Sequence, residues 1–286
     1  MVDHAELERL LSLVKEGKYN TIDGIGPFRT LLSRDGDRRV LDFLQREFKN
    51  LDGKRLAGIA FTLAEHYRQV GDVTSLLRLF ANHDAGVRQY CLNALWEKSG
   101  PNPKMGPAIV QLAVASADDP SPAVRTEVSS VLQNQCAWGI DVSSAITPLR
   151  KLLSDRNERV RQQAGFAVGN IAKKKYDLAE CIRQLRRNVK HKTVSVRYSA
   201  AWALWHLSRN SHEISSAVPE LVWLLTDDEE YNEPRKNAVG ALLHHGRKSP
   251  ANAGKIKDHL DNVVLDETFN EIRKFVAQFG KLRCAS

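Results

Sequence analysis

Apolar residues recur along the chain at intervals of three and four, which is the spacing of one face of an α-helix. In the clearest stretch they are Val160, Ala164, Val168 and Ile171, which fall in one stripe at 3.6 residues per turn. The segment before it, residues 142–155, shows the same periodicity. The pattern therefore predicts antiparallel pairs of amphipathic helices of about four turns each.

One phrase, a Val-Arg pair followed by small and aliphatic residues, repeats along the chain. Its unambiguous copies begin at Val87, Val124, Val160 and Val196, spaced by 37, 36 and 36 residues. A looser copy has Pro234-Arg235 in this place, 38 residues further on, and a weaker early copy begins at Gly53. Neither helix of a pair can bury its stripe alone, so a regular repeat of this length indicates helix pairs stacked into an α-solenoid.

The repeat sets the expected organisation of the whole chain. We expect about eight helix pairs, beginning near residues 3, 36, 71, 104, 142, 176, 213 and 251, in a single all-α solenoid over residues 1–286. The repeats are clear over residues 80–247, and residues 1–79 and 248–286 are expected to form weaker terminal capping repeats. The residue four places after the Val is small or β-branched in every copy and should be buried against the next pair; these residues are Cys91, Val128, Ala164, Ala200 and Ala238.

The motif Asp-x4-Val-Arg, as in "DRNERVRQQAGFAV" from Asp155, resembles the HEAT-repeat family. The resemblance implies that the second helix of each pair lines a concave surface. It also implies that the recurring arginines pair with turn carboxylates of adjacent repeats, for which Asp119 and Asp155 are well placed. In one copy His191 replaces the turn Asp, so any Asp-Arg ladder should be interrupted there. The family resemblance is almost silent on function, because one fold hosts many activities.

Aromatic residues concentrate on the helix face opposite the apolar stripe. The candidate partner-binding residues are Trp96, Phe166, Tyr198, Trp202, Trp205 and His206. Two interpretations stay open: the rings pack between neighbouring second helices, or they form a concave aromatic surface for a ligand. We favour the second, because apolar rings on the outward side of a periodic helix mark interaction surfaces.

Charge is concentrated in one repeat. The chain has a formal net charge of +8, and residues 173–197 hold nine Lys and Arg against Asp177 and Glu180, a net of +7. The predicted basic patch consists of Lys173, Lys174, Lys175, Arg183, Arg186, Arg187 and Lys190. Such a patch suits an acidic protein or a phosphate group. Lys and Arg also follow other second helices, for example Arg209 and Arg247, and the helix dipole explains this general asymmetry.

Signals for catalysis and for cofactors are poor. The sequence has no phosphate-binding GxxxxGK[ST] loop, no HExxH and no GxSxG. Its four cysteines are far apart, and the adjacent His244 and His245 point to two sides of a helix, so no metal site is predicted. The charged, amphipathic amino terminus differs from a secretory signal, and we expect a cytoplasmic protein without a membrane span.

The sequence thus favours a non-catalytic scaffold that needs no cofactor. A protein or peptide partner would lie on the aromatic surface, and the basic patch would recruit an acidic or phosphate-bearing partner. The leading alternative is a nucleic-acid-binding protein, possibly similar to the HEAT-like alkylpurine DNA glycosylases, which combine a basic groove with Trp residues and a catalytic acid. A weaker alternative is a phycobilin lyase, which the phrase "YSAAWAL" resembles.

Overall fold

The computed structural model describes residues 38–49, 53–96, 102–226 and 232–260, together with Ala5 and Ser12. The regular secondary structure of these residues is helical throughout. The chain divides into two compact units, Met1–Val142 and Ser143–Ser286, and each is a stack of helix pairs. The predicted pair near residue 3 lies outside the described residues, and one continuous solenoid over residues 1–286 stays a prediction.

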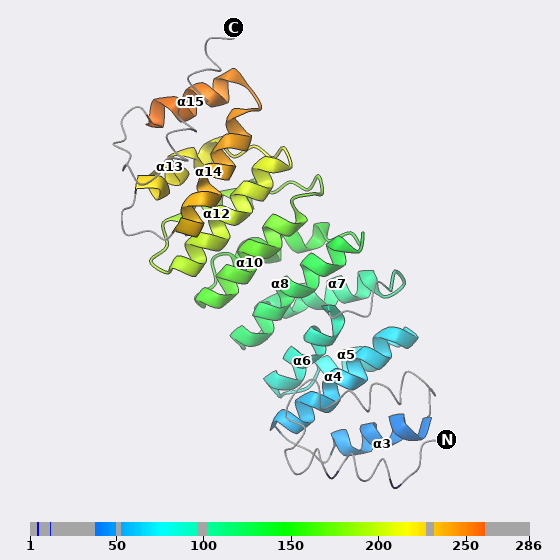
Figure 1. Ribbon diagram of the computed structural model, residues 1–286. Helices are drawn as coiled ribbons and strands as arrows, with labels where there is room; N and C mark the ends of the chain where they lie inside the picture. Colours follow the sequence, from blue (N-terminus) through cyan, green and yellow to red (C-terminus); the bar gives the residue numbers. More distant parts are fainter. Residues whose placement is uncertain are drawn as a thin grey trace. The chain divides into compact units, whose positions relative to one another are not determined.

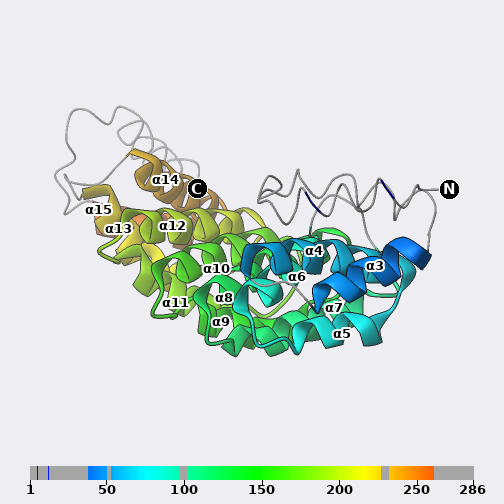
Figure 2. The same ribbon diagram turned by 90° about the horizontal axis from the view of Figure 1, so that it is seen from below.

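From Arg38 onward, the described part of the first unit forms three helix pairs, each of a first and a second helix. They are α3 (Arg38–Phe48) with α4 (Gly53–Val70), α5 (Val73–Phe80) with α6 (Ala85–Trp96), and α7 (Gly106–Ala115) with α8 (Pro122–Ala137). The second helices α4, α6 and α8 lie side by side in one layer (Figure 1). The first helices α5 and α7 lie on the other side of that layer (Figure 2).

The described residues of the second unit repeat this arrangement and continue into a further helix. Its helices are α9 (Ile146–Leu152), α10 (Glu158–Ile171), α11 (Ala179–Val189), α12 (Val194–Arg209), α13 (Val218–Thr226), α14 (Asn232–Gly246) and α15 (Pro250–Leu260). The second helices α10, α12 and α14 pack against one another in sequence (Figure 1). The starts of these pairs agree with the predicted parse, so the repeat length is confirmed.

The core of each unit follows the predicted apolar stripe. Val160, Ala164, Val168 and Ile171 have no exposed surface. The residues four places after the Val of each repeat are also 0–1% exposed: Cys91, Val128, Ala164, Ala200 and Ala238. Burying these aliphatic side chains between neighbouring pairs supplies most of the driving force for stacking.

Several first helices are shorter than predicted. α5, α9 and α13 have 8, 7 and 9 residues, about two turns, so the expected four turns are wrong for these helices. In the second unit a 3₁₀ turn precedes the α-helix, at Ser143–Ala145 and at Ser215–Ala217. Pro148 and Pro219 follow within the first turn of the α-helix, where a missing N–H costs nothing.

Polar side chains tie each repeat to the one before it. Asn102 Nδ2 donates to Arg68 O, 34 residues earlier, at 2.8 Å. Asn188 Nδ2 donates to Leu153 O, 35 residues earlier, also at 2.8 Å. Both carbonyls belong to helix C-terminal turns, whose last C=O groups have no partner within the helix. The following repeat therefore completes the hydrogen bonding of the preceding one.

Candidate functional site

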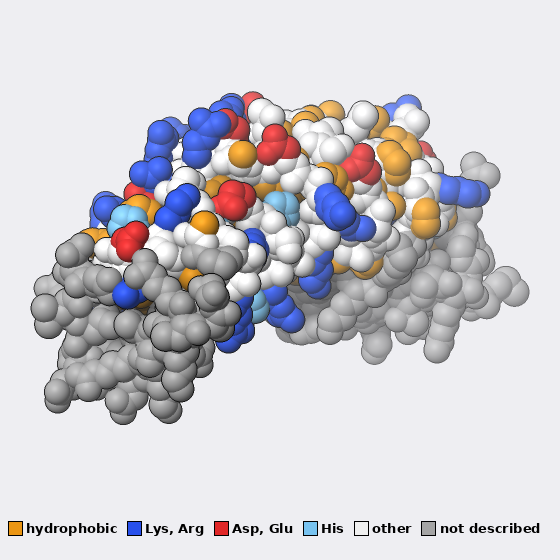
Figure 3. Space-filling view, turned by 90° about the horizontal axis from the view of Figure 1, so that it is seen from above, with side chains coloured by type: hydrophobic (Ala, Val, Ile, Leu, Met, Phe, Trp, Pro, Cys, Tyr) orange, Lys and Arg blue, Asp and Glu red, His pale blue; other side chains and the backbone are white. Residues whose placement is uncertain are grey.

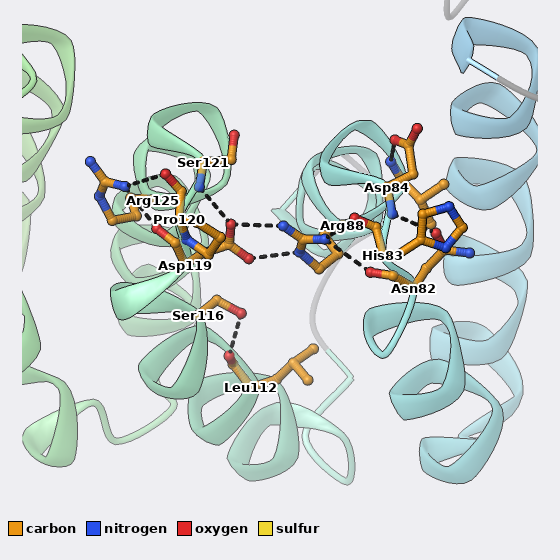
Figure 4. Close-up of polar contacts among 11 residues, drawn as sticks. Asn82, His83, Asp84, Arg88, Leu112, Ser116, Asp119, Pro120, Ser121 and Arg125 are labelled. Atoms are coloured by element: carbon orange, nitrogen blue, oxygen red, sulfur yellow. Dashed lines mark hydrogen bonds and ion pairs between the residues drawn. The ribbon is translucent and has the colours of Figure 1, made fainter.

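The recurring arginine joins adjacent repeats in the first unit. Arg88 Nε lies 2.7 Å from Asp119 Oδ2, and Arg88 Nη2 lies 2.9 Å from Asp119 Oδ1, which makes a bidentate ion pair (Figure 4). Burial raises the pKa of Asp119, but the hydrogen bonds from Arg88 and from the Ser121 backbone N–H outweigh it, and the net pKa is lowered. This arginine is structural, as the resemblance implied.

The same contact is altered in the second unit. Arg161 Nη2 lies 2.8 Å from His191 Nε2, and Arg161 Nε is buried without a hydrogen-bond partner among the described residues. The expected interruption of the Asp-Arg ladder at His191 is therefore confirmed.

Five of the predicted ring residues form one continuous cluster, which we call the ring cluster. Phe166 on α10 contacts Tyr198 and Trp202 on α12, with ring centroids 5.8 and 5.3 Å apart. The His206 ring lies between two indoles, 4.0 Å from Trp202 and 5.2 Å from Trp205. The edge-to-face and tilted geometries are those that aromatic pairs prefer.

The rings are less exposed than a single-helix wheel suggests. All five residues of the ring cluster are half-buried. The Trp202 indole packs on Gly169 of α10, and the Trp205 indole packs on Gly240 of α14. α12 has a second-helix neighbour on each side, α10 and α14, so residues at its flanks are covered. For the same reason Ser199 on α12 is only 1% exposed, although a helical wheel places it opposite the apolar stripe, so the wheel is wrong at this position.

Trp96, the sixth predicted ring, belongs to the first unit. Its indole N–H donates to Glu127 Oε2 at 3.0 Å, and Gln89 Nε2 lies 3.5 Å from Glu127 Oε1. Glu127 is only 8% exposed, although the helical wheel placed it on the outward face. Trp96 thus anchors a buried carboxylate, and we leave it out of the ring cluster.

The carboxyl-terminal ends of α10, α12 and α14 are joined next to the ring cluster. His212 Nε2 lies 2.9 Å from Ala172 O, and Lys248 Nζ donates to His212 O at 2.6 Å. Burial lowers the pKa of His206, and the charges of Arg209 and Lys173 lower it further. The sequence already places these cations at or directly after the ends of the second helices. The helix dipole alone explains that placement, so the sequence did not single them out together as a site.

The predicted basic patch is partly neutralised within the chain. On α11, Arg183 forms an ion pair with Glu180, and Arg186 Nε lies 2.7 Å from Glu220 Oε1. Lys190 Nζ lies 5.5 Å from the centroid of the Trp223 ring, a cation–π contact. Arg187 Nη1 lies 3.3 Å from the Gln184 side-chain oxygen. Lys173, Lys174 and Lys175, in the loop after α10, remain exposed.

Lys and Arg side chains gather at the left of the face drawn in Figure 3, with a few Asp and Glu side chains beside them. Cationic surface of this kind attracts negatively charged groups over a distance of about 10 Å at moderate salt. The side chains on α11 that have partners contribute less to this attraction than the free lysines after α10.

One polar cluster resembles hydrolase chemistry but cannot perform it. Ser215 Oγ lies 2.9 Å from His245 Nε2, and Glu213 Oε1 lies 3.5 Å from the same nitrogen. A nucleophilic triad needs the acid on the other ring nitrogen, where it orients the base. His245 Nδ1 is instead buried with no partner in the part of the chain that the structure describes. The cluster is a capping arrangement, since Glu213 also accepts from the Ser215 backbone N–H at 2.7 Å.

Two further searches concern metals and membranes. Over the described ranges, no group of three or more His, Cys, Asp and Glu side chains could hold a metal ion. Within the same ranges, no helix is both long and apolar enough to cross a bilayer.

Comparison with known proteins supports the fold. The sequence model of the family described as HEAT repeats matches residues 111–205. None of the curated proteins matches the sequence. Among solved structures, the chain is similar to an engineered protein from a structural genomics consortium, with 20% identity and a TM-score of 0.61 over 96% of this chain and 71% of that one.

Two designed armadillo repeat proteins are also similar. One has 20% identity and a TM-score of 0.56 over 73% of this chain and 99% of its own. The other, solved in complex with the peptide (KR)4, has 20% identity and a TM-score of 0.52 over 76% and 98%. Likeness at this identity concerns the fold. Residues 111–205 therefore match the HEAT repeats of that family, and the helix pairs of the chain have the fold of an α-solenoid.

Proposed function

We propose that this chain is a non-catalytic binding scaffold that holds a segment of a partner protein on the ring cluster of its second unit. The observation that carries the proposal is the cluster itself, five half-buried rings from two adjacent repeats in unbroken contact. Aromatic side chains dominate the energetics of protein interfaces because they bury a large area at a small entropic cost.

The rings are held in place before any partner arrives. Gly169 and Gly240 leave room for the indoles of Trp202 and Trp205, and the second-helix backbones on either side are rigid supports. A preformed surface loses little conformational freedom on binding, so more of the contact energy appears as affinity. The complex of a designed armadillo repeat protein with the peptide (KR)4 illustrates that a helical-repeat protein of similar fold can bind a peptide.

The test is selection of binders from a random peptide display library on the immobilised full chain, followed by affinity measurements on the selected peptides. Trp202→Ala and Tyr198→Ala should each weaken binding by about 2 kcal/mol, roughly thirtyfold, as hot-spot residues do. Trp223→Ala is the matched control, because Trp223 is an exposed tryptophan on α13 outside the ring cluster. Circular dichroism verifies that each variant stays folded.

Two results would overturn the proposal. The first is a library that yields no binder to the folded chain. The second is a set of peptides that bind the folded Trp202→Ala and Tyr198→Ala variants as tightly as the unchanged chain.

A further inference from the structure

The carboxyl-terminal ends of α10, α12 and α14 carry a set of exposed cations that we call the cationic rim. Its members are Lys173, Lys174, Lys175, Arg209 and Arg247. None of them forms an ion pair with any carboxylate that the structure describes, in contrast to Arg183 and Arg186 on α11. The rim therefore has charge available for a ligand.

The loops that carry the rim are joined to one another by hydrogen bonds. The hydrogen bonds of His212 with Ala172 O and with Lys248 Nζ join the loops that follow α10, α12 and α14. Lys173 and Arg209 also lie close enough to His206 to lower its pKa, after burial as the larger cause. Packed helices are about 10 Å apart, so an extended segment of six to eight residues would cross all three ends.

On α10, the helix positions beside the rings carry no negative charge. They are Gln162, Gln163 and Asn170. In the first unit, the matching face of α8 carries Glu127, which is buried against Trp96. Carboxylates of a ligand would thus meet only cations and neutral groups on the ring face of α10.

We infer that the segment held by the ring cluster is acidic: an aromatic or aliphatic side chain of the partner packs on the rings while its Asp and Glu side chains meet the cationic rim. This inference rests on the proposed function and adds the chemistry of the partner. Complementary charge beside an apolar contact fixes the register of a bound segment and speeds its association.

The same geometry argues against a nucleic acid as the ligand. Bases stack on open aromatic faces. His206 at 4.0 Å and Gly169 lie against the Trp202 indole, so a base could not stack on its whole face, whereas each of the five rings remains partly exposed for contact with a single side chain.

The experiment measures fluorescence polarisation with the full chain and four labelled probes. Three are peptides of about twelve residues that share their Phe and Leu positions and carry Glu, Gln or Lys elsewhere; the length spans three helices about 10 Å apart. The fourth is a single-stranded oligothymidylate. We expect the Glu peptide to bind about tenfold or more tightly than the Gln peptide, and the Lys peptide to bind least.

Two triple variants locate the charge effect. The rim variant combines Lys173→Gln, Arg209→Gln and Arg247→Gln and should weaken the Glu peptide about tenfold while leaving the Gln peptide unchanged. The control variant combines Arg156→Gln, Arg159→Gln and Lys192→Gln, which remove the same charge from exposed residues at the opposite ends of α10 and α12. It should change the affinity of the Glu peptide less than twofold.

The outcomes separate this inference from the proposed function. If the Gln or Lys peptide binds as tightly as the Glu peptide, the ring surface still binds segments but the acidic partner is refuted. If the oligothymidylate binds more tightly than the Glu peptide and loses affinity in the rim variant, the ligand is a nucleic acid and the inference fails. If the display library yields no binder and none of the peptides binds, both are wrong.

Discussion

Arg161 and His191 meet across two adjacent repeats, with Nη2 of the arginine 2.8 Å from Nε2 of the histidine. In the first unit the corresponding contact is the bidentate ion pair of Arg88 with Asp119 (Figure 4). The histidine offers one acceptor atom where the carboxylate offers two. Arg161 Nε is consequently left buried without a partner among the described residues.

His191 also makes a contact within its own loop that competes with the contact to Arg161. The Thr193 backbone N–H points at His191 Nδ1 at 3.0 Å, so both ring nitrogens face N–H donors. A neutral imidazole has one nitrogen that accepts and one that carries a proton. One of the two contacts therefore places two hydrogens against each other. An Asp side chain in this place would accept both hydrogen bonds, as Asp119 does from Arg88 and Ser121.

His191→Asp should stabilise the second unit by about 1–2 kcal/mol, because a charge-assisted pair replaces a frustrated contact. Urea unfolding followed by circular dichroism measures the change. The same substitution in an Arg161→Gln background is the control, since the gain should vanish when the arginine is absent. An equal gain in both backgrounds would show that the pair does not form.

The pH dependence of stability should reveal the same histidine. Burial, and then the charge of the neighbouring Arg161, lower the pKa of His191 below its ordinary value of 6.5. The unfolded chain thus binds the proton more readily than the folded chain, and stability falls as pH drops below about 6.5.

The measurement compares the unchanged chain with His191→Asp in urea series between about pH 7.5 and 5, above the range in which Asp titrates. The stability difference should widen as the pH falls and then level off. The other histidines are present in both chains and largely cancel. A constant difference across this range would mean that His191 titrates alike in the folded and unfolded states.

Two glycine substitutions, which should change the free energy of unfolding in opposite directions, test how the rings are packed. A Cβ at Gly240 would lie 2.8 Å from Trp205 Nε1, so Gly240→Ala should displace the indole and cost about 1–3 kcal/mol. A Cβ at Gly254 on α15 would meet no atom within 4 Å, so Gly254→Ala should stabilise by about 0.5–1 kcal/mol through helix propensity.

Urea unfolding gives both stability changes, and tryptophan fluorescence reports the displaced indole. A stabilising Gly240→Ala with unchanged fluorescence would mean that the Trp205 ring is not seated against α14.

Cys91 and Cys181 should resist modification in the folded chain. Both are fully buried in the core, and burial raises the pKa of each thiol, to about 12 for Cys181. Only the thiolate is reactive, so iodoacetamide at pH 8 should label these two residues only after denaturant is added. Peptide mass spectrometry measures the labelling at each site. Fast labelling of Cys181 under native conditions would show that α11 opens readily.

The sequence predicted the repeat length and the buried stripe because every copy carries the same apolar pattern. It could not predict how far the rings are buried. A helical wheel treats one helix alone, whereas the cover over Trp202 and Trp205 comes from Gly169 and Gly240 on the helices beside it. Those glycines are informative only once the register between helices is known.

The partners of the basic patch were hidden for a similar reason. Glu220 lies 34 residues after Arg186, one repeat later, and only the stacking of α11 with α13 brings the two together. The conflict at His191 was visible as a missing Asp, but its severity depends on the donors that surround the ring.

Some carbonyls at helix carboxyl-terminal ends are capped by an asparagine of a later repeat. This limits how the repeats of this protein can be recombined. Asn188 completes the end of α9, so α9 and α10 cannot be taken out as an independent cassette without leaving Leu153 O uncapped. Chimeras of this chain should accordingly be cut so that each donor asparagine travels with its acceptor. In a library assembled by helix pair alone, most members would separate a donor asparagine from its acceptor carbonyl and would be less stable for that reason.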